Sequence, residues 1–271
     1  MRAVGLTLGA MVAAIALVGC GGSDSDSAAG TSTTAAAKEK LTICSDIPYE
    51  PMEFEASPPE STPSGYTGFD IDLVQTIADG AGRELEVKVT AFDSIFAAMD
   101  AGTCDAVVSS VTITDERKEN MNFSEPYFDS DQSILVPKAN ESTITSLDDL
   151  KGKNIGVQSG TTGEEYVNSN TPEGATVTAL PGAADLFAAL EAGTIDAVVQ
   201  DYPINAYRAT QNDNVVVTAR ITTNEKYGMA TPKKDGAATL ELLNAGLAKA
   251  KSDGTYAQLY EKYFGEKPPA S

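Results

Sequence analysis

The sequence predicts an α/β protein built from two lobes of related architecture. From Leu41 onward, short apolar runs alternate with helical patterns, and this β-α-β order favours a mainly parallel sheet covered by helices. One segment, 96–110, is then echoed by a second, 187–201. A chain of 271 residues with a hydrophobic fraction of 42% is long and apolar enough to give two such lobes their own cores.

The first β-α-β unit opens the folded part of the chain. LTICSD (41–46) is typical of a strand, and FDIDLVQTIADGAG (69–82) carries its apolar residues on one helical face. Gly80 and Gly82 are expected to end this helix, because glycine easily takes the left-handed conformation found there. LEVKVT (85–90) alternates with a period of two, which predicts a second strand.

An internal repeat, called here the internal echo, predicts the position of a cleft. FAAMDAGTCDAVVSS (96–110) and FAALEAGTIDAVVQD (187–201) each combine helical spacing, a glycine and a short apolar strand. A chance likeness of two such units is the alternative explanation. The echo puts Ser110 and Asp201 just past the ends of equivalent strands. Since ligands of open α/β sheets bind outside the carboxyl ends of strands, we expect both residues to face one shared site.

The composition excludes several classes of function. The formal net charge is −20, and nucleic acid is not expected as a partner because phosphate backbones require Lys and Arg. The chain has no histidine, which removes the commonest general base and the commonest metal ligand and weakens enzyme hypotheses. Three cysteines are too few for a four-ligand metal cage, and no cofactor is expected.

The N-terminus has the pattern of a signal peptide followed by a lipidation site. Residues 1–19 form a predicted signal peptide, because a basic residue precedes an apolar run too short for a transmembrane span. The run ends in LVGC, which resembles the bacterial lipobox, so Cys20 is expected to be lipidated; ordinary cleavage is the alternative. Residues 20–39 are small and polar and predict a flexible tether. The protein is therefore expected to lie outside the cytoplasm, lipid-anchored to the cell membrane.

A set of motifs carries a family resemblance. The most specific is TITDER (112–117) followed by NFSEPY (122–127). Others are SDIPY (45–49), GFDIDL (68–73), LDDLKG (147–152), VQSGTT (157–162), DYP (201–203), YGMA (227–230) and the segment 254–265. In this order they resemble the polar amino-acid-binding proteins of ABC transporters, bacterial extracellular solute-binding protein family 3.

The resemblance implies the fold of type II periplasmic-binding proteins. In that fold two Rossmann-like lobes are joined by a two-strand hinge, with the ligand cleft between them. The first lobe would comprise 40–127 and 229–271, and the second 132–224. The hinge would lie near 126–131 and 224–228. Binding would be non-covalent and followed by closure of the hinge over the ligand.

The resemblance also assigns roles at the two ends of an amino acid. Arg117 would grip the α-carboxylate, for which its planar fork of donors is suited. On its own, Arg117 could equally be a surface arginine paired with its acidic neighbours. Backbone amides of Thr161 and Thr162 would assist at a helix N-terminus. Asp201 would accept the α-ammonium.

Four more positions match ligand contacts of the family, and a fifth lies in its turn motif. Ser110 and Thr112 would help to hold the α-ammonium, and Gln158, in the VQSGTT segment at the start of the second lobe, is also expected to bind the ligand. Tyr49 and Phe92 would form aromatic walls around the side chain of the ligand. Their alternative role is that of plain core residues.

Asp46 is the most informative residue for the choice of substrate. In relatives that bind cationic or amide side chains, the matching Asp meets the distal polar group, and an unpaired buried carboxylate requires such a partner. The alternative is that Asp46 caps local backbone amides. Ser110, Gln200 and the longer, proline-rich loop 55–66 depart from the pattern of relatives and leave the ligand open.

The resulting prediction is a monomeric, non-enzymatic lipoprotein that captures glutamine, histidine, arginine or lysine and delivers it to the permease subunits of an ABC importer. One alternative is a cyclohexadienyl dehydratase, of arogenate or prephenate type, on the same fold. Another is a ligand-sensing receptor domain. Fold alone does not decide among them.

Cys44 and Cys104 are candidates for a disulfide, since export permits one. Cys44 lies near the ligand end of its strand, however, whereas Cys104 comes before the start of another strand. Parallel register would then hold their Cα atoms farther apart than the ~7 Å that a bridge tolerates. A bridge is therefore not expected, although the sequence leaves it open.

Overall fold

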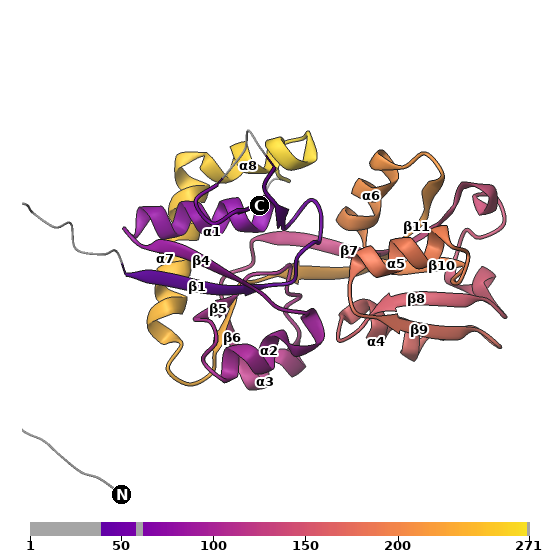
Figure 1. Ribbon diagram of the computed structural model, residues 1–271, viewed down its shortest axis with the longest axis horizontal. Coiled ribbons are helices and arrows are strands. Elements are labelled where there is room, and N and C mark those ends of the chain that lie inside the picture. The colour runs from indigo at the N-terminus through magenta and orange to yellow at the C-terminus, as the bar shows by residue number, and fades with distance from the viewer. Residues whose placement is uncertain (1–38, 58–61, 270–271) are drawn as a thin grey trace, which may run out of the picture. The chain divides into compact units, whose positions relative to one another are not determined.

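The computed structural model describes residues 39–57 and 62–269. Within them lie two five-stranded sheets, with strand orders β4-β1-β5-β12-β6 and β11-β7-β10-β8-β9, and a small hairpin (Figure 1). The predicted signal peptide, Cys20 and nearly all of the tether lie outside the described residues. In the described part, no helix combines the length and apolar character needed to cross a membrane.

The first sheet contains both strands predicted from the first β-α-β unit. Its strands are β1 (Lys40–Ser45), β4 (Glu84–Val89), β5 (Ala106–Val107), β6 (Met121–Phe123) and β12 (Ala230–Pro232). β1 pairs with β4 and β5 in parallel, while β12 joins β5 and β6 antiparallel. The hairpin strands are β2 (Phe54–Glu55) and β3 (Tyr66–Thr67).

Helices cover both faces of this sheet. They are α1 (Phe69–Gly80), α2 (Phe92–Asp100), α3 (Asp115–Asn120), α7 (Ala237–Asp253) and α8 (Thr255–Phe264). The helix predicted over 69–82 is thus confirmed as α1, with the chain turning at Gly82, whose φ is 69°. Because side chains alternate across a strand, Ala106 joins the core under α1, whereas Val107 joins the core under α2.

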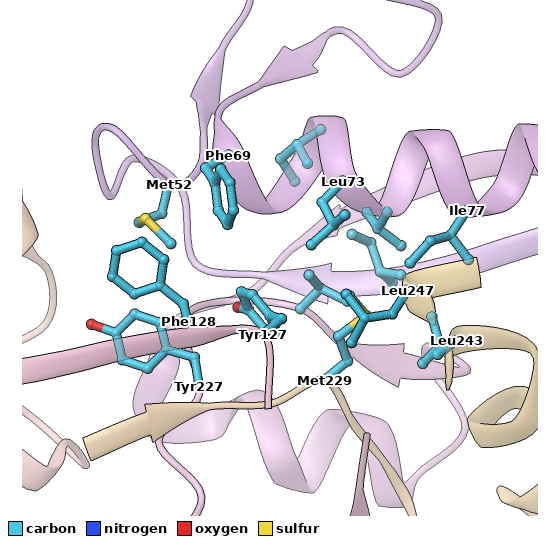
Figure 2. Close-up of a cluster of buried hydrophobic side chains, with 14 of the residues drawn as sticks. Met52, Phe69, Leu73, Ile77, Tyr127, Phe128, Tyr227, Met229, Leu243 and Leu247 are labelled. Atoms are coloured by element: carbon cyan, nitrogen blue, oxygen red, sulfur yellow. The ribbon is translucent and has the colours of Figure 1, made fainter. Parts of the chain in front are cut away.

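The main core lies between α1, α7 and the sheet. Figure 2 shows Phe69, Leu73 and Ile77 along the inner face of α1, with Leu243 and Leu247 of α7 beneath them. Each of these side chains is at most 2% exposed. Burying one large apolar side chain contributes roughly 1.5–3 kcal/mol. These contacts therefore hold α1, which begins close to the candidate site, firmly against α7 and the sheet.

The second sheet repeats this design. Its strands are β7 (Phe128–Pro137), β8 (Asn154–Gln158), β9 (Thr176–Leu180), β10 (Ala197–Asp201) and β11 (Val215–Tyr227). Its helices are α4 (Thr162–Ser169), α5 (Ala183–Glu191) and α6 (Tyr202–Gln211), with short turns η1 (Lys138–Asn140) and η2 (Leu147–Leu150). Along β10, Val199 packs in the core beside α4 and Val198 in the core beside α5.

The internal echo has the same hydrogen bonds in both copies. In the first sheet, the amide of Asp105 donates to the Thr42 carbonyl at 2.8 Å, and its carboxylate accepts from the Thr42 amide at 2.8 Å. In the second sheet, Asp196 makes the same pair of bonds with Asn154, at 2.7 and 2.8 Å. The repeated segment therefore reflects two structurally equivalent units rather than a chance likeness.

Two antiparallel strands connect the sheets. Figure 1 shows β7 and β11 running from one sheet toward the other. At the end of β7 and β11 that joins the core of the first sheet, Phe128 pairs with Tyr227, and their rings stack with centroids 5.5 Å apart (Figure 2). The lobe boundaries expected from the sequence, and bending at 126–131 and 224–228, stay predictions.

The expectation that Cys44 and Cys104 are too far apart is wrong. They form a disulfide with Cα atoms 5.7 Å apart. The expectation treated Cys104 as an extension of its strand, but the chain reaches β5 from α2, which lies over the sheet. Both cysteines therefore share the buried cluster beneath α2 with Phe92 and Met99. Closing a loop across 60 residues restricts the unfolded chain by about 4 kcal/mol in the chain-entropy model.

Candidate functional site

All of the ligand residues expected from the sequence line a single cavity, and Ser109 lines it as well. They are Asp46, Tyr49, Phe92, Ser110, Thr112, Arg117, Gln158, Thr161, Thr162 and Asp201. The cavity lies where β1 and β5 of one sheet and β8 and β10 of the other end. Their carboxyl ends are the edges at which open α/β sheets bind ligands.

Arg117 is held inside this cavity rather than at the surface. Its side chain belongs to α3, and the residue is only 8% exposed. The guanidinium donates to the Thr112 carbonyl at 2.9 Å and to the Gly160 carbonyl of the opposite sheet at 3.1 Å. The rings of Phe92 and Phe96 lie 5.5 and 5.3 Å from its central carbon, within cation–π range. The alternative of a surface arginine paired with acidic neighbours is therefore wrong.

The electrostatics around Arg117 suit an anion. Burial lowers the pKa of Arg117, and the charges of Glu165, Asp201 and Glu225 oppose that effect. A guanidinium stays protonated in proteins and has five N–H donors, of which two are directed to carbonyls. The remaining donors can serve a carboxylate group.

The turn after β8 supplies further donors. Thr161 begins α4: its hydroxyl accepts from the Glu164 amide at 3.2 Å and donates to the Gln158 carbonyl at 2.8 Å. Gly160 has a φ of 78°, which glycine adopts without strain, and a Cβ there would come within 3.1 Å of Asp93 across the cavity. Thr161 and Thr162 line the cavity, which therefore lies against the N-terminus of α4, the positive end of a helix.

Asp201 lines the same cavity. It is 7% exposed, and its carboxylate accepts hydrogen bonds from Gln132 Nε2 and from the Tyr227 hydroxyl. Burial, together with the charge of Glu225, raises the pKa of Asp201 to about 7, against the lowering effect of the hydrogen bonds. A cationic partner would stabilise the ionised form of this buried carboxyl group.

Glu225 is a site residue that the sequence reasoning missed. Its Oε2 accepts from the hydroxyls of Thr112 and Thr162, at 2.7 and 2.8 Å, so the segment after β5 and the N-terminus of α4 share one acceptor. Its Oε1 accepts from Gln132 and Thr223, each at 2.9 Å. Its only sequence clue is its place two residues before the YGMA motif, in a polar stretch typical of an exposed strand.

Asp46 faces the second sheet rather than its own backbone. Its Oδ2 accepts a hydrogen bond from Gln158 Nε2, and its amide donates to Ser109 Oγ at 2.9 Å. No local backbone amide of the described residues donates to its carboxylate, which argues against the capping alternative. Burial raises the pKa of Asp46 to about 6, with smaller contributions from Asp93 and Asp185 and an opposing one from Gln158.

The aromatic and serine positions serve the cavity and the core together. Tyr49 and Phe92 line the cavity, are each 8% exposed and belong to buried clusters, which is the core role weighed for them. Their role as aromatic walls around a ligand side chain stays a prediction. Ser110 has a φ of 49°, an uncommon left-handed conformation for a residue with a side chain. Its amide donates to Asp70 Oδ2 at 2.7 Å, which holds the strained turn in place.

This arrangement matches a zwitterion with a donor-bearing side chain. Arg117 and the N-terminus of α4 supply positive potential to the cavity, and Asp201 supplies a carboxyl group, while the Glu225 carboxylate holds Thr112 and Thr162. Asp46 adds a separate carboxyl group on the wall. Among the residues that the structure describes, no cluster of His, Cys, Asp and Glu could hold a metal ion.

A family comparison agrees with this geometry. The sequence model of the bacterial extracellular solute-binding proteins, family 3, matches residues 41–266. This match spans both sheets and every residue of the cavity.

Individual relatives cover nearly the whole chain. A probable histidine-binding protein of Neisseria gonorrhoeae is 34% identical over 261 residues, which are 93% of this chain and 92% of that protein. The ABC transporter glutamine-binding protein GlnH of Bacillus subtilis is 34% identical over 97% of both chains. Among solved structures, an ancestral arginine-binding protein bound to arginine superposes with a TM-score of 0.77 at 37% identity, covering 84% of this chain and 99% of that one.

Proposed function

The chain belongs to the bacterial extracellular solute-binding proteins, family 3, and from that premise we propose that it captures a polar or cationic amino acid and delivers it to an ABC importer. It is a binding protein rather than an enzyme, as are the relatives described above. The dehydratase alternative predicts product formation from arogenate or prephenate. We expect none.

One observation carries the proposal: a buried guanidinium shares a single cavity with two carboxyl groups of raised pKa. Arg117 suits the α-carboxylate of an amino acid, and Asp201 suits its α-ammonium. Each end by itself is common in proteins. Their combination across two sheets fits a small zwitterion.

Asp46 supports the choice of side chain. It lies on the wall of the cavity, and its raised pKa means that its ionised form lacks full compensation. A distal ammonium, guanidinium, imidazolium or amide would supply the missing donor. The proposed ligands are therefore arginine, lysine, histidine and glutamine. Relatives named for histidine, glutamine and arginine support this range.

A thermal-shift screen against the twenty amino acids, followed by calorimetry of the best, tests the proposal. The expected result is a large upward shift of the melting temperature with one or more of the four proposed ligands. A preference for glutamate or leucine would overturn the assignment of Asp46. No shift with any amino acid would overturn the proposed function itself.

We also propose that the protein is a monomer tethered to the outer face of the cell membrane through a lipid on Cys20. The support is the LVGC sequence at the end of an apolar run and the polar segment that follows it. Cys20→Ser should move the protein from the membrane fraction to the soluble fraction. Unchanged retention of that variant in the membrane fraction would contradict the anchor.

A further inference from the structure

Two carboxyl groups lie together behind the cavity, in the core of the first sheet. Glu53 and Asp70 are both 0% exposed. One oxygen of each, Glu53 Oε2 and Asp70 Oδ1, receives no hydrogen bond from a described donor of the chain. The two carboxyl groups are nonetheless within hydrogen-bonding reach of each other.

Among the residues that the structure describes, no cation compensates these two carboxyl groups. The titratable side chains that face them are Asp46, Tyr49, Tyr127 and Tyr256, and no Lys or Arg of the described residues forms an ion pair with either carboxyl group. Two adjacent buried carboxylates without a counterion would be very costly. A proton held between them removes one of the two charges and gives both orphaned oxygens a partner.

The surrounding donors decide which group keeps the proton. Asp70 Oδ2 accepts from the Ser110 amide and from the Tyr127 hydroxyl, each at 2.7 Å. Glu53 Oε1 accepts only from Ser109 Oγ, at 2.7 Å. Donors stabilise the ionised form, so Asp70 is the carboxylate and Glu53 the acid. In agreement, burial raises the pKa of Glu53 well above its ordinary range, whereas the pKa of Asp70 rises to about 6.

We propose that Glu53 and Asp70 share one proton and that this acid–carboxylate pair holds the Ser109–Ser110 turn in its ligand-binding position. Ser109 links the pair to the site, because its hydroxyl donates to Glu53 and accepts from the Asp46 amide at 2.9 Å. Asp70 anchors the left-handed backbone of Ser110. Glu53 and Asp70 are thus positioning residues that lie outside the ligand cavity.

The shared proton makes the turn sensitive to alkaline pH. Loss of the proton from Glu53 would place two repelling charges beneath Ser109 and Ser110. The turn would then shift, and affinity for the amino acid would fall. This second consequence rests on the proposed function, whereas the shared proton itself does not.

The proton is tested without any amino acid. In protein carrying 13C-carboxyl-labelled glutamate, NMR should show one glutamate carboxyl still protonated at pH 7, roughly three pH units above the ordinary glutamate pKa. That resonance should disappear in Glu53→Gln and persist in the matched control Glu55→Gln, whose side chain is exposed. If every glutamate is ionised at pH 7 in the wild type, the shared proton is excluded.

Ligand affinity tests the positioning role. The side-chain amide of the Glu53→Gln variant would keep an acceptor for Ser109 and a donor for Asp70, so this variant should bind within about threefold of the wild type at pH 7. Glu53→Ala should bind at least about tenfold more weakly, because it leaves buried partners unpaired. As the pH rises above 7 and Glu53 loses its proton, the ratio of wild-type to Glu53→Gln affinity should fall, and this ratio cancels the titration of the ligand itself.

Equal affinity of the Ala and Gln variants, or a ratio that is constant with pH, would overturn the positioning role. If the wild type binds none of the amino acids, the proposed function fails, and the NMR titration still decides whether Glu53 carries the proton. The two failures are therefore distinguishable.

Discussion

Gln158 donates a hydrogen bond from its Nε2 atom to Oδ2 of Asp46 and so joins the carboxyl ends of β8 and β1, one in each sheet. The bond between Arg117 and the Gly160 carbonyl spans the same gap. Both contacts belong to a state in which the two sheets approach each other closely. A small ligand that reaches both sides would favour this state over an open one.

Ligand binding should therefore close the protein and stabilise it together. At a free ligand concentration about 100 times its Kd, the free energy of unfolding should rise by about 2.7 kcal/mol. Small-angle X-ray scattering should show a smaller radius of gyration under the same conditions. A stabilised protein with an unchanged radius would place the whole binding site on one side of the cavity and contradict closure.

Arg117→Ala should weaken amino-acid binding by roughly 2–5 kcal/mol, because a desolvated carboxylate loses its bidentate partner. Arg117→Lys should recover little of the loss, since an ammonium lacks the planar fork. Calorimetry measures both effects. Arg83→Ala, at a partly exposed ion pair with Glu39 and outside the cavity lining, is the matched control and should bind normally. Near-normal binding by a folded Arg117→Ala variant would remove Arg117 from the site.

Asp46 and Asp201 should respond differently to the same change. Asp201→Asn should weaken the binding of every amino acid, because the α-ammonium is common to all of them. Asp46→Asn should instead reorder the preferences among side chains, with the greatest loss for cationic ones. Competition binding with a panel of amino acids separates the two effects. If Asp46→Asn weakened the binding of all amino acids equally, Asp46 would not determine the preference for the ligand side chain.

Affinity should fall as the pH is lowered. The pKa values of Asp201 and Asp46 are raised to about 7 and about 6 in the folded protein, and a cationic ligand requires both groups ionised. Binding should therefore release protons between pH 5 and 7, which calorimetry in buffers of different ionisation enthalpy measures. Below the pKa of Asp201, affinity should drop by up to about tenfold per pH unit, and below the pKa of Asp46, where two protons must leave, by up to about a hundredfold per unit.

The folding stability of the ligand-free protein depends on pH in the opposite direction to ligand affinity. A raised pKa means that the folded state holds these protons more tightly than the unfolded chain does. The stability that they contribute is present below the ordinary aspartate pKa of ~3.9 and is lost as the pH rises through about 6 and 7. Denaturation with and without ligand should show these opposite slopes. Affinity that does not change from pH 5 to 8 would exclude ionisation of Asp201 as a requirement.

Glu225→Gln should loosen the site without removing a predicted ligand contact. The amide has one carbonyl oxygen in place of the two carboxylate oxygens shared by four donors, so affinity should fall roughly tenfold. The charge of Glu225 raises the pKa of Asp201, so the acid limb of the binding profile should also move to lower pH. Glu241→Gln, on the exposed side of α7, is the control. An unmoved acid limb would mean that Glu225 does not act on Asp201.

The sequence alone determined the local elements and the membership of the cavity. α1, β1 and β4 follow from apolar spacing within a few turns of chain, which is a short-range property. The cavity residues were reached through ordered motifs that resemble one family, and the internal echo placed Asp201 at a strand end. Both kinds of inference use information that is written in order along the chain.

Tertiary structure alone decided the features that depend on distance between separate segments. The bridge from Cys44 to Cys104 follows from the path of the chain beneath α2. The role of Glu225 follows from two threonines, 50 residues apart in the sequence, that donate to one carboxylate. The pairing of Glu53 with Asp70 follows from both being sealed in the same core. Hydrogen bonds and charges act over a few ångströms, and residues far apart in sequence reach that range only once the chain has folded.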